Sequence, residues 1–149
     1  NAIYDQIKID APSNIAIASR SGDVLLAGEV PNKKIRHAVG ETVARVGGVN
    51  KVYNFLKVGK PVNLSTRLED TWITTKVKSQ FLANSEINPA GIKVTTENHV
   101  VFLMGSVTPH MAKEAVKLAR ETKGVHEVVK IFEYIHLTPT PLDNGTSTG

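Results

Sequence analysis

The sequence predicts an α+β fold of two tandem α-β-β-α-β units, each a three-stranded mixed sheet with its helices on one face. Three observations lead to this prediction: an internal repeat, two strands joined by a turn in each copy, and a helical pattern before the third strand. The opening helix of the first unit is expected to be truncated, because only its end, about Ala2 to Tyr4, is present. With 41% hydrophobic but only 5% aromatic residues, the core must be aliphatic, and the many Val and Ile residues favour sheet.

The repeat places residues 14–46 over residues 91–123, and two glycines keep step with the apolar positions. Chance supplies matched Val and Ile residues more readily than matched glycines, so we interpret the pattern as a duplication. We place one extra residue of the first copy after its helix, which aligns Val39 with Val116. The strongest pairs are Leu26 with Leu103, Gly28 with Gly105, Val30 with Val107 and Gly48 with Gly124.

The first strand of each copy has the period of two that is typical of strands, with Ile15 and Ile17 separated by alanine in the first copy, and a short polar turn joins it to a second strand. A helix then separates the second strand from the third, so these two strands should be parallel and joined by a right-handed crossover. The expected strands are residues 15–19, 24–30 and 51–58 in the first copy and 92–96, 100–107 and 127–135 in the second.

Helix ends and boundaries follow from local signals. Asn32 and Thr108 are candidate N-caps, and Pro109 suits a first helical position. The second copy should have a complete opening helix, residues 71–83, with Asp70 as its N-cap. Residues 59–69 contain Gly and Pro and no period, which indicates a linker. The predicted division is 1–58 for the first unit, 59–69 for the linker, 70–137 for the second unit and 138–149 for a disordered tail.

The predicted helix 71–83 carries apolar residues on two opposite sides. At about 100° per residue, Ile73, Val77 and Phe81 form the stripe that should pack on the sheet. Trp72, the only tryptophan, and Leu82 fall on the other side among small residues and lysines. This pattern is typical of a helix in contact with a membrane interface. A second interpretation remains open, in which Trp72 packs against the first unit or the linker.

The residues also resemble a known family. In each copy a strand ends in an apolar-Gly step, and a Gly-Val-x-x-Val pattern follows, at Gly48 to Val52 and at Gly124 to Val128. Together with the segments DTWITTKVKSQFL, KVTTEN and VFLMGSVT, these features resemble the dual BON-domain lipoproteins of the Gram-negative outer membrane.

The resemblance implies a periplasmic protein at the inner leaflet of the outer membrane, anchored by a lipidated cysteine that has no counterpart in this chain. It implies a role in envelope integrity, a place at the cell division site, and binding of anionic phospholipid, notably phosphatidylglycerol, by the first helix of the second BON domain. Outer-membrane assembly proteins are further expected partners, and we expect a monomer. The candidate lipid contacts are Trp72, Thr75, Lys76, Lys78, Ser79 and Leu82, joined by Val77 if the helix rolls.

Other functions find little support in the sequence. The chain has no cysteine, its histidines have no metal spacing, and no serine has the surroundings of a nucleophile, so we expect no enzyme, cofactor or metal. The net charge of +4 is not gathered into a stripe, and no GXXG clamp or aromatic platform accompanies it, which argues against nucleic acid as a partner. An adaptor for envelope assembly proteins, using the sheet edges, is the alternative.

Overall fold

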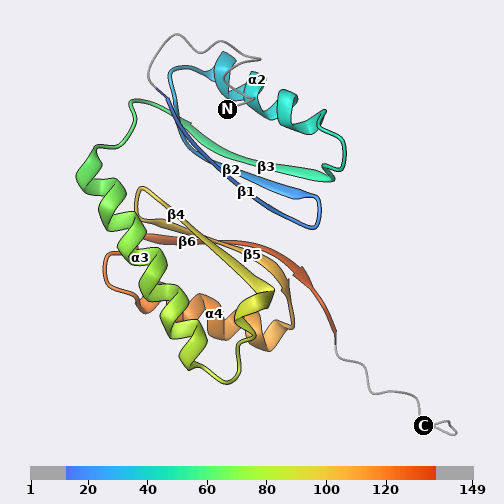
Figure 1. The fold of residues 1–149 in the computed structure, drawn as a ribbon, viewed down its shortest axis with the longest axis vertical. Helices are drawn as coiled ribbons and strands as arrows, with labels where there is room; N and C mark the ends of the chain where they lie inside the picture. The colour runs from blue at the N-terminus through green and yellow to red at the C-terminus, as the bar shows by residue number, and fades with distance from the viewer. Residues whose placement is uncertain (1–12, 137–149) are drawn as a thin grey trace, which may run out of the picture.

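The computed structural model describes residues 13–136, and Figure 1 shows the arrangement of the two units. The stub of the first helix and the C-terminal tail that the sequence predicts lie outside these residues. The order of elements confirms the tandem repeat: each unit contains a three-stranded mixed sheet, with strand orders β1-β2-β3 and β4-β5-β6. None of the helices between residues 13 and 136 is both long and apolar enough to cross a membrane.

The first unit contains a hairpin, a helix and a third strand. β1 pairs antiparallel with β2, and β2 pairs parallel with β3, as the crossover predicts. The helix α2 lies on one face of this sheet, where Val39 and Val43 are buried (Figure 1). The elements are β1 (Asn14–Arg20), β2 (Asp23–Val30), α2 (Lys33–Ala44) and β3 (Lys51–Val58).

The second unit repeats this plan and adds a long opening helix. β4 pairs antiparallel with β5, β5 pairs parallel with β6, and both helices contribute to one core on the same face of the sheet. The elements are α3 (Leu64–Ala83), the short 3-10 helix η1 (Pro89–Gly91), β4 (Ile92–Glu97), β5 (Val100–Val107), α4 (Pro109–Glu121) and β6 (Glu127–Tyr134).

The paired glycines of the repeat occupy a site where two strands come very close. A Cβ atom on Gly28 would lie 2.0 Å from the carbonyl oxygen of Asn14, and one on Gly105 would lie 2.0 Å from that of Gly91. No side chain fits at such a separation, so the start of each hairpin requires glycine on the opposite strand. The close approach of the two strands therefore explains why both copies have glycine at this position.

The caps confirm the helix starts but shift the alignment of the repeat. The side chain of Asn32 accepts a hydrogen bond from the N–H of Ile35, and that of Thr108 accepts one from the N–H of Met111. Counted from these caps, Val39 corresponds to Ala115, and both are fully buried. The alignment of Val39 with Val116 was therefore wrong, because the extra residue of the first copy precedes the helix instead of following it.

The two sheets pack against each other with their helices outside, so the molecule has four layers (Figure 1). Phe102 and Met104 from β5 meet Leu25 and Ala27 from β2 in a shared apolar cluster. The rings of Phe55 and Phe102 meet edge to face, 5.3 Å apart. Both faces of β2 and β5 are consequently covered, which explains their nearly continuous apolar sequences.

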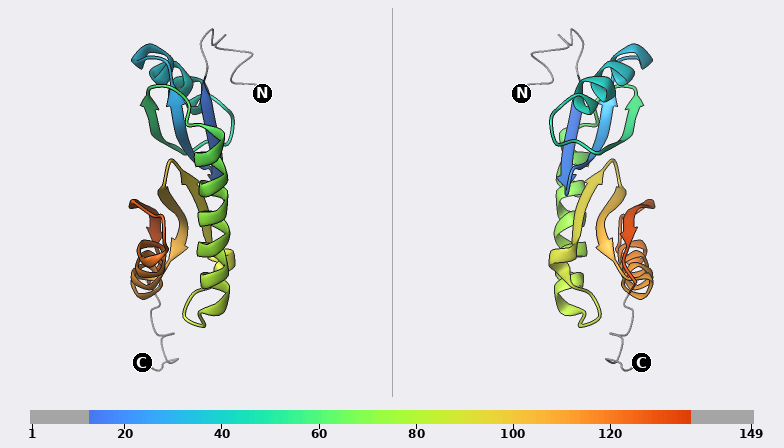
Figure 2. Two further views of the ribbon diagram at one scale, coloured as in Figure 1. Left: turned by 90° about the vertical axis from the view of Figure 1, so that its left-hand side faces the viewer. Right: turned by 90° about the vertical axis from the view of Figure 1, so that its right-hand side faces the viewer.

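Helix α3 begins seven residues before the predicted helix, at Leu64 in place of Thr71. Its N-cap is Asn63, whose side chain accepts a hydrogen bond from the N–H of Thr66, so the assignment of Asp70 as N-cap was wrong. Much of the predicted linker is thus helical. The added turns carry α3 past its own sheet toward the first unit (Figure 2).

Candidate functional site

Polar contacts fix how α3 is rotated about its axis. Asp70 is 5% exposed, and its two carboxylate oxygens accept hydrogen bonds from the N–H groups of Asn98 and His99, at 2.7 and 2.8 Å. Further along the helix, the Thr74 hydroxyl donates to Thr96 Oγ1 at 2.8 Å. Because these bonds lie along one side, the opposite side of α3 is held toward solvent.

The inward side of α3 is the stripe that the sequence predicts. Ile73, Val77 and Phe81 are all buried in the core that α3 shares with α4 and the sheet. Val77 is 0% exposed, so it does not lie with the other candidate lipid contacts. With the helix anchored through Asp70 and Thr74, it cannot reach the surface without breaking those hydrogen bonds.

The outward side of α3 carries an apolar stripe that is longer than expected. Trp72 is 62% exposed and Leu82 is 72% exposed, so Trp72 is not covered by the first unit. Leu64 and Leu68, at 70% and 62% exposed, extend the stripe toward the helix N-terminus. Sequence reasoning missed both because it assigned them to a linker, although the spacing of 64, 68 and 72 is that of one helix face.

The polar candidates surround this stripe. Thr75, Lys78 and Ser79 are exposed, and the ammonium group of Lys76 lies 5.7 Å from the centre of the Trp72 ring. The Thr75 hydroxyl donates to the carbonyl oxygen of Thr71 at 3.0 Å, which satisfies its donor within the helix. The outward side of α3 therefore presents apolar side chains with lysines beside them. It has few hydrogen-bond donors that lack a partner within the helix.

A cationic groove of about 390 Å³ adjoins Leu82. Its lining includes Lys78 from α3, Lys93 from β4 and Arg20 from the end of β1. Lys93 Nζ donates to the carbonyl oxygen of Ser19 at 3.2 Å, and Arg20 Nη1 donates to that of Ala90 at 3.4 Å. Arg20 and Lys93 escaped the sequence analysis, since nothing in the chain predicts that the two units bring them beside α3.

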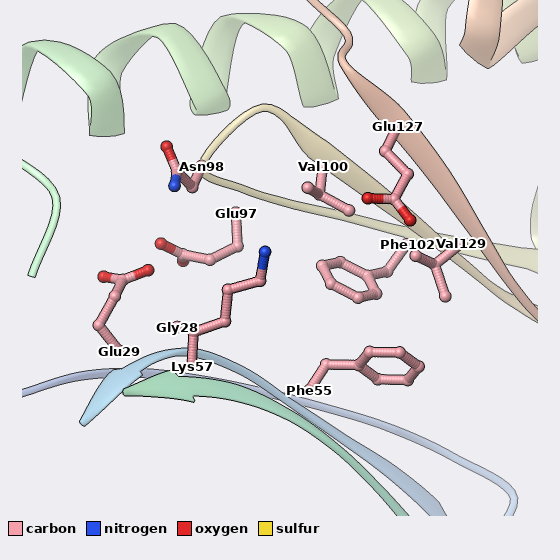
Figure 3. Close-up of a pocket in the computed structure, with 10 residues that line it drawn as sticks. All are labelled: Gly28, Glu29, Phe55, Lys57, Glu97, Asn98, Val100, Phe102, Glu127 and Val129. Atoms are coloured by element: carbon pink, nitrogen blue, oxygen red, sulfur yellow. The ribbon is translucent and has the colours of Figure 1, made fainter. Parts of the chain in front are cut away.

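Two carboxyl groups meet at the boundary between the units (Figure 3). Asn14 Nδ2 donates to Glu97 Oε2 at 2.8 Å and to Glu29 Oε1 at 3.2 Å, which holds the two acids together. Burial, then the neighbouring charges of Glu29 and Asp70, raise the pKa of Glu97 to about 7. The side chain of Lys57 rises beside them from β3, in a cavity of about 160 Å³. This cluster ties the units together in a way that depends on pH.

Some of the histidines lie beside acidic side chains. His99 Nε2 lies 2.9 Å from Glu69 Oε1, and His110 Nε2 lies 2.6 Å from Glu86 Oε1. Among residues 13–136, no group of three His, Cys, Asp or Glu side chains could hold a metal ion.

These features define a class of protein: tandem α+β units, one of which presents an exposed apolar helix beside a cationic groove. A family model for the BON domain matches residues 2–60 and again residues 69–135. The chain belongs to the BON-domain family, as the resemblance implies, and its two copies are the two units of the structure.

The chain is similar to two bacterial proteins over most of its length and to a third over a shorter stretch. The chain is 36% identical over 135 residues to "Outer membrane lipoprotein DolP" of Haemophilus influenzae, a match covering 91% of this chain and 70% of that protein. It is 36% identical over 130 residues to the "21 kDa hemolysin" of Actinobacillus pleuropneumoniae, covering 87% of this chain and 66% of that protein. It is also similar to "Osmotically-inducible protein Y" of Escherichia coli, with 34% identity over 90 residues, 60% of this chain and 37% of that protein.

Proposed function

We propose that this protein is associated with the outer membrane of the cell envelope and binds anionic phospholipid through the outward side of α3. The observation that carries the proposal is the exposed stripe of Leu64, Leu68, Trp72 and Leu82 on a helix whose rotation is fixed. The similarity to an outer membrane lipoprotein supports the location at the outer membrane. The periplasmic side of that membrane is part of the proposal. The protein would support envelope integrity by binding, with no chemical step.

Simple energetics support weak but useful membrane binding. A buried Trp side chain removes roughly 150–250 Å² from water, and each Å² is worth about 25 cal/mol. The 62% of Trp72 that is exposed is therefore worth about 2–4 kcal/mol on full insertion. Each lysine near an anionic surface adds about 1 kcal/mol, and Lys76 and Lys78 lie on this helix.

The groove beside Leu82 indicates where a lipid headgroup would lie. Lys78, Lys93 and Arg20 line it. A phosphate oxygen is a strong acceptor for the N–H donors of such cations. With the acyl chains beside Leu82 and the phosphate in this groove, α3 would lie in the plane of the interface.

The test is binding to vesicles of phosphatidylglycerol and phosphatidylcholine, compared with vesicles of phosphatidylcholine alone. Trp72 is the only tryptophan, so its emission should shift to the blue on the anionic vesicles only. Trp72→Glu should weaken co-sedimentation at least about tenfold, because the expected insertion energy of about 2–4 kcal/mol exceeds the ~1.4 kcal/mol of a tenfold change.

The matched control is Val46→Glu, which changes the charge equally at an apolar residue that is 54% exposed in the first unit, just after α2. This variant should sediment with vesicles as the wild type does. Unchanged Trp72 emission on anionic vesicles, or equal losses in the two variants, would contradict the proposal.

A further inference from the structure

The two units differ at the outer edge of the third strand, beside the helix that precedes this strand in each unit. In the first unit this edge is closed by Arg36 of α2. Its guanidinium donates to the carbonyl oxygens of Leu56 at 2.8 Å and Asn54 at 2.9 Å. The Asn54 side chain completes the closure by donating to the carbonyl oxygen of Arg36 and accepting from the N–H of Leu56.

Register and caps identify the equivalent residues in the second unit. Leu26 pairs with Asn54 in the first sheet, and its counterpart Leu103 pairs with Lys130 in the second, so Lys130 occupies the place of Asn54. Arg36 is the fourth residue after the N-cap Asn32, and Ala112 is the fourth after the N-cap Thr108. The second unit therefore has a methyl group where the first has a guanidinium.

This exchange leaves a groove of about 590 Å³ between α4 and β6. Ala112, Val116 and Tyr134 provide its apolar surface. Among the described residues, no side chain forms a hydrogen bond to the backbone of β6, which is an edge strand of its sheet. The backbone groups that Arg36 and Asn54 satisfy in the first unit are thus open in the second.

The charges around this groove are mainly positive. Lys113, Lys117 and Arg120 line it from α4 and Lys130 lines it from β6, whereas Glu121 is its one acidic residue. The ion pairs among residues 13–136 all involve histidines, so none of these four cations has an acidic partner there. An occupant with negative charge would complement them.

We propose that the groove between α4 and β6 binds an extended acidic segment of a partner protein, which adds as a strand to the edge of β6. An open strand edge beside a helix recognises a peptide backbone, and alternate side chains of that peptide can reach the cations. In the first unit Arg36 donates to the strand carbonyls as the N–H groups of such a peptide would. This site goes beyond the lipid surface, since α3 and the α4–β6 pair lie along opposite edges of the sheet (Figure 2).

The probe is a fluorescein-labelled peptide of about ten residues that alternates Thr or Val with Glu, long enough to span a strand of this length at ~3.3 Å per residue. Fluorescence anisotropy with the full chain should show saturable binding below about 1 mM. A peptide of the same charge with Pro at every second residue lacks half of the backbone N–H donors, so it should bind at least about tenfold more weakly.

The decisive variant transfers the closure of the first unit to the second. Ala112→Arg with Lys130→Asn leaves the net charge unchanged but should close the groove, so peptide affinity should fall at least about tenfold while vesicle binding persists. A second variant, Lys113→Glu with Lys117→Glu, changes two exposed cations of the groove and should also lower the affinity for the acidic peptide at least about tenfold. This second variant keeps the test valid if the first fails to fold.

Three results would overturn the proposal. The wild type fails to bind the alternating peptide, the closed variant binds it as tightly as the wild type, or the Pro-containing peptide binds equally well. If the closed variant instead loses vesicle binding, the groove serves a membrane and the assignment to a peptide is wrong.

Discussion

Asp70 offers the sharpest test of how α3 is fixed to its unit. Its carboxylate accepts hydrogen bonds from Asn98 and His99, two residues of the β4–β5 turn whose φ angles are 50° and 65°. Such angles are unfavourable for residues other than glycine, so this turn needs outside support. Asp70→Ala removes both acceptors and leaves two N–H groups without their partners.

The expected loss of stability follows from these contacts. A hydrogen bond to a charged group contributes about 1.5–3 kcal/mol, and Asn98 is exposed, so water replaces part of the loss. We expect Asp70→Ala to lower the free energy of unfolding by about 2–4 kcal/mol, measured by urea denaturation with circular dichroism. Vesicle binding should weaken as well, because the rotation of α3 is no longer fixed.

The control is Asp23→Ala, which removes an acid at the first residue of β2. Its carboxylate accepts one exposed contact from Asn50 at 3.5 Å, too long to contribute much. We expect a change within about 0.5 kcal/mol. If Asp70→Ala is as mild as this control, the account of α3 as a helix locked by its turn contacts fails.

Two further predictions concern the boundary between the units. Between pH 4.5, the ordinary pKa of a Glu side chain, and about pH 7, folded Glu97 keeps a proton that the unfolded chain releases. The stability that this group contributes is therefore fully present below pH 4.5 and is lost as the pH rises through 7. Glu97→Gln should therefore raise the melting temperature at about pH 8 and change it little near pH 4, and equal shifts at both pH values would contradict this. Phe102→Ala should cost about 3–5 kcal/mol in urea denaturation because Phe102 is 5% exposed, whereas Phe55→Ala, at 38% exposed, should cost markedly less.

The sequence predicted the fold where local signals were strong. Alternating residues and the paired Gly28 and Gly105 located the hairpins, and the N-caps Asn32 and Thr108 located two helices. The start of α3 was missed because Asp70 resembles an N-cap, although it satisfies a turn distant in the chain. Local patterns do not reveal such long-range acceptors.

The candidate site was predicted in part for the same reason. Trp72 and Leu82 could be placed outward because one helix determines their direction, and the structure leaves both exposed. Arg20 and Lys93 join the site only through the packing of the two sheets. That packing had one signal in the sequence: the strands 24–30 and 100–107 are apolar on both faces, which indicates that both faces are covered.

The packing of the two sheets also has a consequence for the chain as a duplicated object. Each unit covers an apolar sheet face that its twin would otherwise leave in water, with Leu25 and Ala27 on one side and Phe102, Met104 and Ile131 on the other. A single unit expressed alone would expose this face and would tend to associate with a second copy. The tandem chain thus behaves as a dimer whose subunits are joined covalently, which keeps the partner at high effective concentration.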